Sequence, residues 1–318
     1  MDIAERILFG VDDSESARQA GATAGALLKY RENTNITIFY GAPDPQLSSL
    51  AKALRRTPNV VEEYRKVCSL QEHRILEQAY EALIDSGFNA DRVTIRGEGK
   101  CHDPAETMLQ LAADEASETI GLGKSSTGRL ERMLMGSVSY RLVHCADEKT
   151  IWVIDSPIGS HDVLVALVGA PISRRVMEHT VRYFAHLRES RFTFFHVVPP
   201  LPPQYWDNTR ILMEQERKER EMQITQWTKE CADKVREIAA EGEDRLLQAG
   251  VREENVAFKS QPVETGMARD ILAELAEGKY GILVIGRKGF REASPFRLGS
   301  KASKLLNNAR QCMICLVN

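Results

Sequence analysis

The chain repeats one succession of apolar strand and amphipathic helix, and this repeat limits the fold more than any other feature. An apolar run at residues 7–11 is followed by a helical pattern that opens near Ser14. The same plan restarts about 156 positions later, with an apolar run at residues 163–168 and a helical pattern that opens at Ser173. Short apolar runs before turn residues predict buried strands, and the apolar spacing that follows predicts helices.

The remaining elements also match between the halves. Second strands are expected near residues 35–40 and 192–197, third strands near 92–95 and 255–258, fourth strands ending at Gly123 and Gly286, and fifth strands near 150–154 and 313–317. Long polar helical stretches at residues 60–86 and 208–249 are each followed by glycine, which is a typical helix stop. Strands that alternate with helices predict a doubly wound, parallel α/β sheet with helices on both faces, present twice in tandem.

Length and composition agree with two soluble domains. The 318 residues suffice for two domains of ordinary size, and the turn-forming segment 156–161 separates predicted domains at residues 1–156 and 161–318. A net charge of −3 predicts no broad basic face, so nucleic acid is not expected as a partner. No apolar run reaches the roughly 18 residues of a membrane span, and the start lacks a signal-peptide pattern, so no membrane partner and a cytoplasmic location are expected.

Cysteine and histidine suggest no metal or catalytic site. Cys312 and Cys315 lie in a predicted final strand, where residues three apart point to opposite faces, so they are interpreted as buried apolar residues. His196 lies in an apolar strand and is interpreted as a satisfied core histidine. No histidine has a matching nucleophile arrangement, so no catalytic residue is proposed.

A glycine-rich segment follows the fourth strand of the second half. Gly286, Gly289, Gly299 and Ser300 have the spacing G-x2-G-x9-G-S. Glycines at the carboxyl end of a strand let backbone N–H groups approach a phosphate, and a helix start favours anions. Cationic side chains in the same segment are those of Arg287, Lys288 and Lys301. The spacing fits neither a Walker A loop nor a dinucleotide fingerprint, and the alternative is a turn that binds nothing.

The first half carries a related segment and an acid that the second half lacks. Its loop residues are Gly123, Ser126, Gly136 and Ser137, so serine stands where the second glycine is expected. Asp12 follows the first strand, whereas Val168 holds the matching position in the second half. A serine Cβ narrows the space at a phosphate loop, although its hydroxyl can donate to phosphate. Asp12 also fits a simpler role at the start of a helix.

The repeat plan and the two loops resemble the universal stress protein family over nearly the whole chain. This resemblance implies Rossmann-like domains of the adenine nucleotide alpha hydrolase type, each with a five-stranded parallel sheet. It implies pairing through the last strands, which would join the two domains within one chain and leaves a homodimer open. Many members bind ATP, with an acid near the nucleoside and the glycine loop on ribose and phosphates, and some members have lost nucleotide binding.

Neither half carries the complete family pattern, so three functions remain open. The first is an adenine-nucleotide-binding regulatory module of the stress response, which binds ATP with or without Mg²⁺ and preferentially at the intact second-half loop. The second is an interaction scaffold that binds no nucleotide, because each half lacks one part of the pattern. The third is an enzyme, with weak ATP hydrolysis at most. The charged helix near residues 208–249 is interpreted as solvent-facing, with a partner surface as the alternative.

Overall fold

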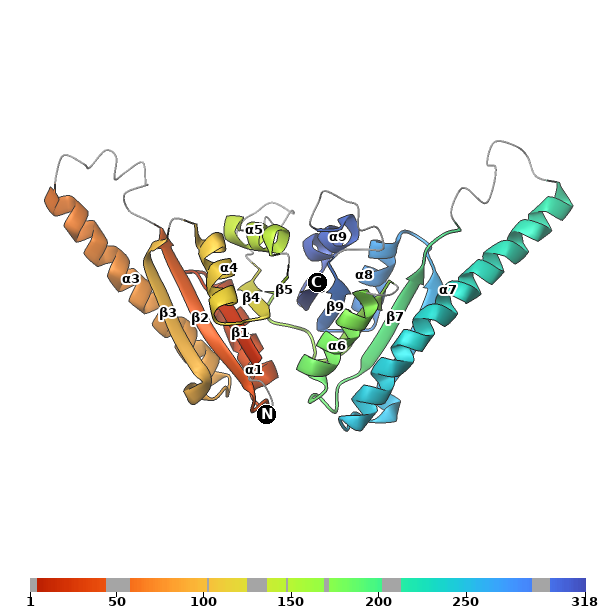
Figure 1. Cartoon of the computed structure of the whole chain (residues 1–318), viewed down its shortest axis with the longest axis horizontal. Coiled ribbons are helices and arrows are strands. Elements are labelled where there is room, and N and C mark those ends of the chain that lie inside the picture. The colour runs from red at the N-terminus through yellow and green to blue at the C-terminus, as the bar shows by residue number, and fades with distance from the viewer. Residues whose placement is uncertain are drawn as a thin grey trace. The chain divides into compact units, whose positions relative to one another are not determined.

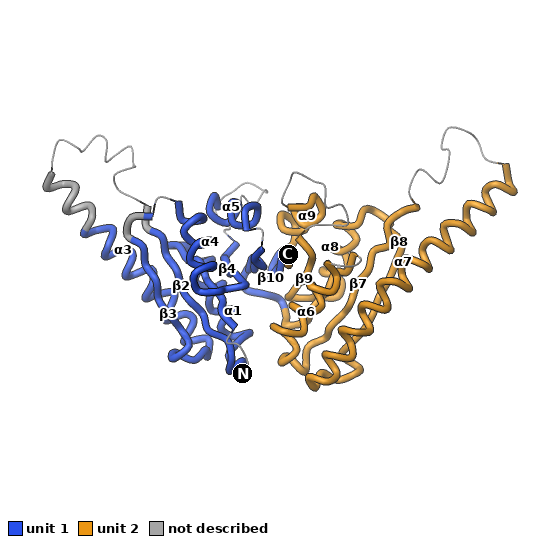
Figure 2. The backbone as a smooth tube through the Cα atoms, viewed as in Figure 1, with its two compact units in different colours: residues 1–159, 310–316, 318 blue, residues 160–309, 317 orange. Residues whose placement is uncertain are grey.

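The computed structural model shows strands and helices that alternate along the chain (Figure 1). It describes residues 5–43, 58–101, 103–124, 136–146, 148–168, 172–201, 213–287 and 298–318. Contacts divide the chain into two compact units (Figure 2). Unit 1 comprises residues 1–159, 310–316 and 318, and unit 2 comprises residues 160–309 and 317. The domain limits at 156 and 161 stay a prediction.

Unit 1 is built on a parallel sheet with one antiparallel strand. Its order is β3-β2-β1-β4-β5-β10, and the first five strands run parallel. The last strand of the second repeat, β10, pairs antiparallel with β5, the last strand of the first repeat. The strands are β1 (Glu5–Gly10), β2 (Thr34–Pro43), β3 (Val93–Cys101), β4 (Thr119–Gly123), β5 (Thr150–Ile154) and β10 (Met313–Val317). The helices are α1 (Glu15–Leu28), α3 (Pro58–Asp85), α4 (Pro104–Asp114) and α5 (Ser137–Cys145).

Unit 2 repeats this plan. Its strands run parallel in the order β9-β6-β7-β8. The strands are β6 (Val163–Leu167), β7 (Phe192–Val198), β8 (Val256–Pro262) and β9 (Ile282–Gly286). The helices are α6 (Ile172–Phe184), α7 (Glu214–Gln248), α8 (Met267–Glu277) and α9 (Ser300–Asn308). Both units therefore have the predicted α/β fold, with a parallel-dominated sheet and flanking helices.

Helices cover both faces of each sheet, which explains why a central strand such as β6 is apolar along its whole length. In β1, Phe9 packs on the α1 side, where it lies 3.8 Å from an ideal Cβ placed on Gly21. The next residue, Gly10, faces Met108 of α4, whose Cε lies 2.6 Å from such a Cβ. Successive residues of a strand point to opposite faces, so both faces must be apolar. In β6 every residue is buried for the same reason.

Strand pairing corrects the predicted alignment of the second strands by one residue. Ile7 pairs with Ile36, and Val163 pairs with Phe192. The offset between the halves is therefore 156 for both of the first two strands, and Asn35 does not match Phe192. Every residue of β7 is buried, so the pattern of apolar residues alone cannot decide between registers one residue apart.

Glycine ends both long helices, as predicted. Gly87 and Gly250 follow α3 and α7 with φ values of 94° and 92°. These values lie in the left-handed region, which glycine adopts without a steric penalty from Cβ. Residues 208–212, which the prediction includes in the second long helix, lie outside the described residues.

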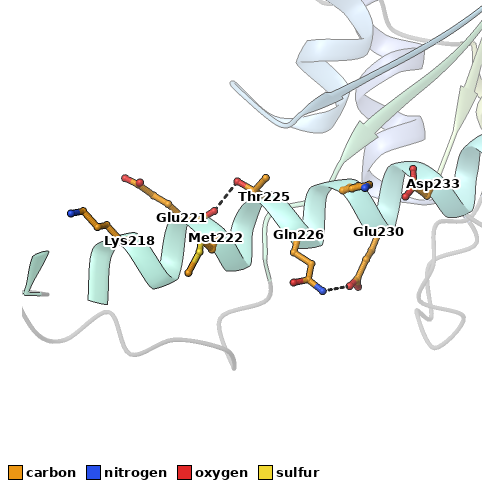
Figure 3. Close-up of a pocket in the computed structure, with 8 residues that line it drawn as sticks. Lys218, Glu221, Met222, Thr225, Gln226, Glu230 and Asp233 are labelled. Carbon is orange, nitrogen blue, oxygen red and sulfur yellow. Dashed lines mark hydrogen bonds between the residues drawn. The ribbon is translucent and has the colours of Figure 1, made fainter. Parts of the chain in front are cut away.

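The first half of α7 extends beyond the strands of unit 2 (Figure 1). The buried side chains of this helix begin at Val235. Before that point, side-chain pairs one turn apart support the helix, as between Glu214 and Lys218 at 3.1 Å. The described residues that line a surface groove here, between 218 and 233, all come from α7, and Figure 3 shows their side chains. Such a groove has no opposite wall within the described residues, which favours the solvent-facing interpretation.

Candidate functional site

The predicted site residues that the structure describes lie at the carboxyl ends of strands or at the helix starts that follow them. In unit 1 these are Asp12 after β1, Gly123 at the end of β4, and Gly136 and Ser137 at the start of α5. In unit 2 they are Gly286 and Arg287 at the end of β9, and Gly299, Ser300 and Lys301 at the start of α9. Ser126, Lys288 and Gly289 lie outside the described residues.

A backbone hydrogen bond brings the two ends of the second-half loop together. The N–H of Gly299 donates to the carbonyl oxygen of Arg287 at 3.0 Å. The N–H of Arg287 in turn donates to the carbonyl oxygen of Val317 at 2.7 Å, which continues the sheet hydrogen bonding past β9. The end of β9 and the start of α9 are therefore held side by side, although 12 positions separate Arg287 from Gly299.

The helices that follow the two glycine loops lack side-chain caps. Gly136 and Gly299 are the N-cap residues of α5 and α9, and neither helix has a side-chain cap hydrogen bond. By contrast, Ser14 caps α1 by accepting from the N–H of Ala17 at 3.1 Å, and Asp103 caps α4. First-turn N–H groups that no side chain occupies leave room for an anion, which the helix dipole also favours.

Close packing alone explains the glycine at one loop position. A Cβ on Gly123 would lie 2.8 Å from Cα of Ala17 and 2.9 Å from the carbonyl oxygen of Ser16. These are backbone atoms of α1, so they cannot move aside easily. The described atoms nearest to a Cβ on Gly286 would be those of the Ile172 side chain, with Cγ1 at 2.5 Å. At Gly136 a Cβ would meet none of the described residues within 4 Å.

The acid after β1 makes local contacts at the start of α1. Oδ1 of Asp12 accepts from the N–H of Ser14 at 3.0 Å and from the Ser14 hydroxyl. The neighbouring Asp13 forms an ion pair with Arg74 of α3 at 2.9 Å. This turn positions the cap of α1, so the simpler role of Asp12 at a helix start is present in the structure.

The lysine that follows Gly123 at the end of β4, Lys124, is buried. It is 4% exposed, and its Nζ lies 3.8 Å from Oδ2 of Asp155. Burial lowers the pKa of Lys124, and the charge of Asp155 partly offsets this effect. The amine therefore braces the ends of β4 and β5. Arg287 holds the corresponding position in unit 2 and is 1% exposed.

The structure also corrects the interpretation of His196 as a fully satisfied core histidine. The residue is 2% exposed, and its Nδ1 lies 2.8 Å from the carbonyl oxygen of Leu167. Nε2 is buried and has no hydrogen-bond partner among the described residues. Sequence patterning missed this half-satisfied ring, because an apolar strand predicts burial and does not reveal the partners of single atoms.

The described residues hold neither a cluster of metal ligands nor a helix suited to crossing a membrane. Within them, no three histidine, cysteine or acidic side chains form a group suited to holding a metal ion. Cys312 and Cys315 are buried at 1% and 0% exposure, as predicted for apolar packing residues. None of the described helices combines the length and apolar character that crossing a bilayer requires.

Comparison with solved structures supports the fold over the full length. A universal stress protein from Archaeoglobus fulgidus aligns with a TM-score of 0.64 and 14% identity, covering 99% of this chain and 98% of that one. A putative universal stress protein from Pseudomonas aeruginosa aligns with a TM-score of 0.56 and 12% identity, covering 99% and 93%. At such identities the likeness concerns the fold alone.

Two universal stress proteins match part of this chain in sequence. Universal stress protein YxiE of Bacillus subtilis is 24% identical over 139 residues, which are 43% of this chain and 90% of that protein. A universal stress protein of Mycolicibacterium smegmatis is 26% identical over 140 residues, and the match spans 41% of this chain and about half (47%) of that protein.

The family assignment does not depend on these pairwise matches. The sequence model of the universal stress protein family matches twice, at residues 4–153 and at residues 159–316. The two matches correspond to the two repeats of strands and helices. Because together they cover nearly all of its residues, the chain belongs to the universal stress protein family and carries two tandem copies of its domain.

Proposed function

We propose that this tandem universal stress protein binds an adenine nucleotide at the second-half loop and acts as a regulatory module in the stress response. The observation that carries the proposal is the hydrogen bond between Gly299 and Arg287. It brings the glycine at the end of β9 next to the uncapped first turn of α9. This is the arrangement of strand end, glycine and helix start that suits a phosphate group.

Each residue of the second-half loop has a part in this proposal. Gly286 and Gly289 leave space for phosphate, and the N–H and hydroxyl of Ser300 donate to its oxygens, since the N–H of Gly299 already donates to Arg287. Lys301 is exposed in the first turn of α9 and adds positive charge. Lys288 adds further positive charge, and Arg287, which is 1% exposed, takes part through its backbone contact with Gly299. Mg²⁺, where present, would be held by the phosphates and water, since no set of acidic ligands is proposed here.

The first-half loop has weaker support as a nucleotide site. Gly123 is required by packing against α1, the Lys124 amine faces Asp155, and Asp12 accepts hydrogen bonds from Ser14. Two parts of the pattern, Gly123 and Asp12, and the neighbouring Lys124 therefore have structural roles that need no ligand. Ser126, Gly136 and Ser137 remain candidate phosphate contacts, and no described residue would contact a Cβ on Gly136.

A second candidate function is an interaction scaffold that binds no nucleotide. It is favoured by the structural roles in the first half and by the exposed first part of α7, where Met222 is 66% exposed. In either function, pairing of the two last strands would join the two domains within one chain. Catalysis beyond weak ATP hydrolysis is not proposed.

The test combines identification of bound nucleotide with titration. The purified chain is denatured, and the released small molecules are identified by mass spectrometry and ultraviolet absorbance. Calorimetric titrations with ATP, ADP and AMP then follow for the wild type, Gly289→Val and Asp12→Ala. We expect Gly289→Val to abolish binding and Asp12→Ala to leave it unchanged. Absence of binding at millimolar ligand would overturn the proposal and favour the scaffold.

A further inference from the structure

His196 lies at the carboxyl edge of the unit 2 sheet, beside the position where the strand-one acid is missing. In the register of β6 and β7, Leu167 pairs with His196, and Val168 is the residue after Leu167. The imidazole is held against the end of β6 by its contact with the Leu167 carbonyl. It is also close enough to Lys301, in the first turn of α9, for that positive charge to lower its pKa.

The contact with Leu167 determines what the second ring nitrogen can do. A carbonyl oxygen only accepts hydrogen bonds, so Nδ1 of His196 carries the proton and donates it to Leu167. Burial lowers the pKa of His196 and outweighs the hydrogen bond to Leu167, which raises it, so the ring is neutral at neutral pH. Nε2 therefore holds a lone pair and is an acceptor that lacks a donor among the described residues.

The two units place different residues at this pair of positions. Gly10 pairs with Phe39 in unit 1, and Ala166 pairs with Phe195 in unit 2. The residues that follow Phe39 and Phe195 are Tyr40 and His196, so these two residues are counterparts. Unit 1 thus has Asp12 and Tyr40 where unit 2 has Val168 and His196. Unit 2 lacks the carboxylate that follows the first strand in unit 1, and it has a nitrogen acceptor on the neighbouring strand β7.

We propose that Nε2 of His196 accepts a hydrogen bond from the nucleoside part of an adenine nucleotide, in place of the acid that is absent at Val168. The proposal rests on nucleotide binding at the second-half loop. The nucleoside offers donors in its ribose hydroxyls and in the 6-amino group of the base. Phosphate oxygens only accept, so a neutral Nε2 does not bind them, and the phosphates go to the start of α9.

Two substitutions separate the acceptor from the rest of the ring. His196→Phe removes both nitrogens and keeps an aromatic ring in a strand that already contains Phe192, Phe194 and Phe195. His196→Gln keeps an amide oxygen that can take the place of Nε2. Tyr40→Phe is the matched control in unit 1. Thermal unfolding of each variant verifies that it folds.

Calorimetric titrations of the full chain use ATP, 2′-deoxy-ATP, inosine triphosphate and inorganic tripolyphosphate. We expect His196→Phe to weaken ATP binding about tenfold, since one buried hydrogen bond is lost, and His196→Gln to restore it to within about threefold. Tripolyphosphate should bind equally to all variants. The analogue that lacks the donor bound by His196 should bind the wild type more weakly than ATP does. The substitution His196→Phe should not weaken the binding of this analogue any further, so the comparison identifies the donor.

The outcomes distinguish this inference from the proposed function. Equal ATP binding by the wild type and His196→Phe would overturn the role of His196 and leave nucleotide binding intact. Absence of ATP binding by the wild type would overturn both. Should His196→Phe fail to fold, the ¹⁵N resonance of Nε2 in the labelled wild type decides: a shift on saturation with ATP supports the contact, and an unchanged resonance overturns it.

Discussion

The N–H of Gly299 donates a hydrogen bond to the carbonyl oxygen of Arg287, with 3.0 Å between nitrogen and oxygen. This contact joins the end of β9 to the start of α9 without using any side chain. Gly299 itself has φ −65° and ψ 147°, an extended conformation that directs the chain into the helix. The first helical residue, Ser300, can therefore be replaced by proline without disturbing the backbone before it.

Ser300→Pro should weaken adenine-nucleotide binding by a factor of about 10 to 100, because it removes one N–H and one hydroxyl that would face charged phosphate. Proline is well tolerated at a first helical position, so the midpoint of thermal unfolding should hardly change. Ser137→Pro is the matched control, since Gly136 before it has φ −54° and ψ 153°. Calorimetric titration of both variants is the measurement. Equal loss in both would mean that the two loops bind alike.

Gly123→Ala should destabilise unit 1 by about 1–3 kcal/mol, because its Cβ would overlap backbone atoms of Ala17 and Ser16. Gly159→Ala is the control, since its nearest neighbour would be the carbonyl oxygen of Gln311 at 4.0 Å. The free energy of unfolding from urea titration measures both. If the two variants unfold alike, packing against α1 does not explain the glycine.

At acidic pH the free energy of unfolding should depend on the buried His179. Burial, aided by the positive charge of Arg182, lowers the pKa of His179 to about 3, against roughly 6.5 in an unfolded chain. Between these two pKa values the unfolded chain binds a proton on this histidine that the folded chain does not bind. The free energy of unfolding therefore has its full value above about pH 6.5 and falls by about 1.4 kcal/mol for each pH unit below it. His179→Gln should remove this contribution.

The measurement is the free energy of unfolding of the wild type and His179→Gln at several pH values between about 4.5 and 7. The difference between the two curves isolates His179 from other groups, such as His196, that titrate in both proteins. Parallel curves would show that His179 is not held neutral in the folded chain.

The two parts of α7 should respond differently to substitution. Leu246 is 0% exposed, and Leu246→Ala should lower the free energy of unfolding by roughly 2–5 kcal/mol. Met222 is 66% exposed, and Met222→Lys should change it by less than about 0.5 kcal/mol. Urea titration at two protein concentrations measures both effects. A large, concentration-dependent loss for Met222→Lys would show that the outer part of α7 is covered in solution by a second chain.

The α/β fold and its tandem repeat could be predicted from the sequence, because the information is local. Apolar runs mark the strands, and Gly87 and Gly250 end the long helices through backbone conformations that glycine favours. The same local signals predicted the placement of Gly286 and Gly299 at the ends of successive elements. Only the fold, however, brings these two ends to one edge, through the contact between Arg287 and Gly299.

The tertiary structure decided the partners of individual atoms. Lys124 looks like a loop lysine in the sequence, but the strand ends place its amine in a buried pair with Asp155. His196 reads as an ordinary core residue until the register with β6 places Nδ1 on the Leu167 carbonyl and leaves Nε2 without a donor among the described residues. Such contacts join segments far apart in the chain, and a local sequence pattern carries no record of them. The sequence by itself therefore determined the helices and strands, whereas the packing of these elements against one another determined the site.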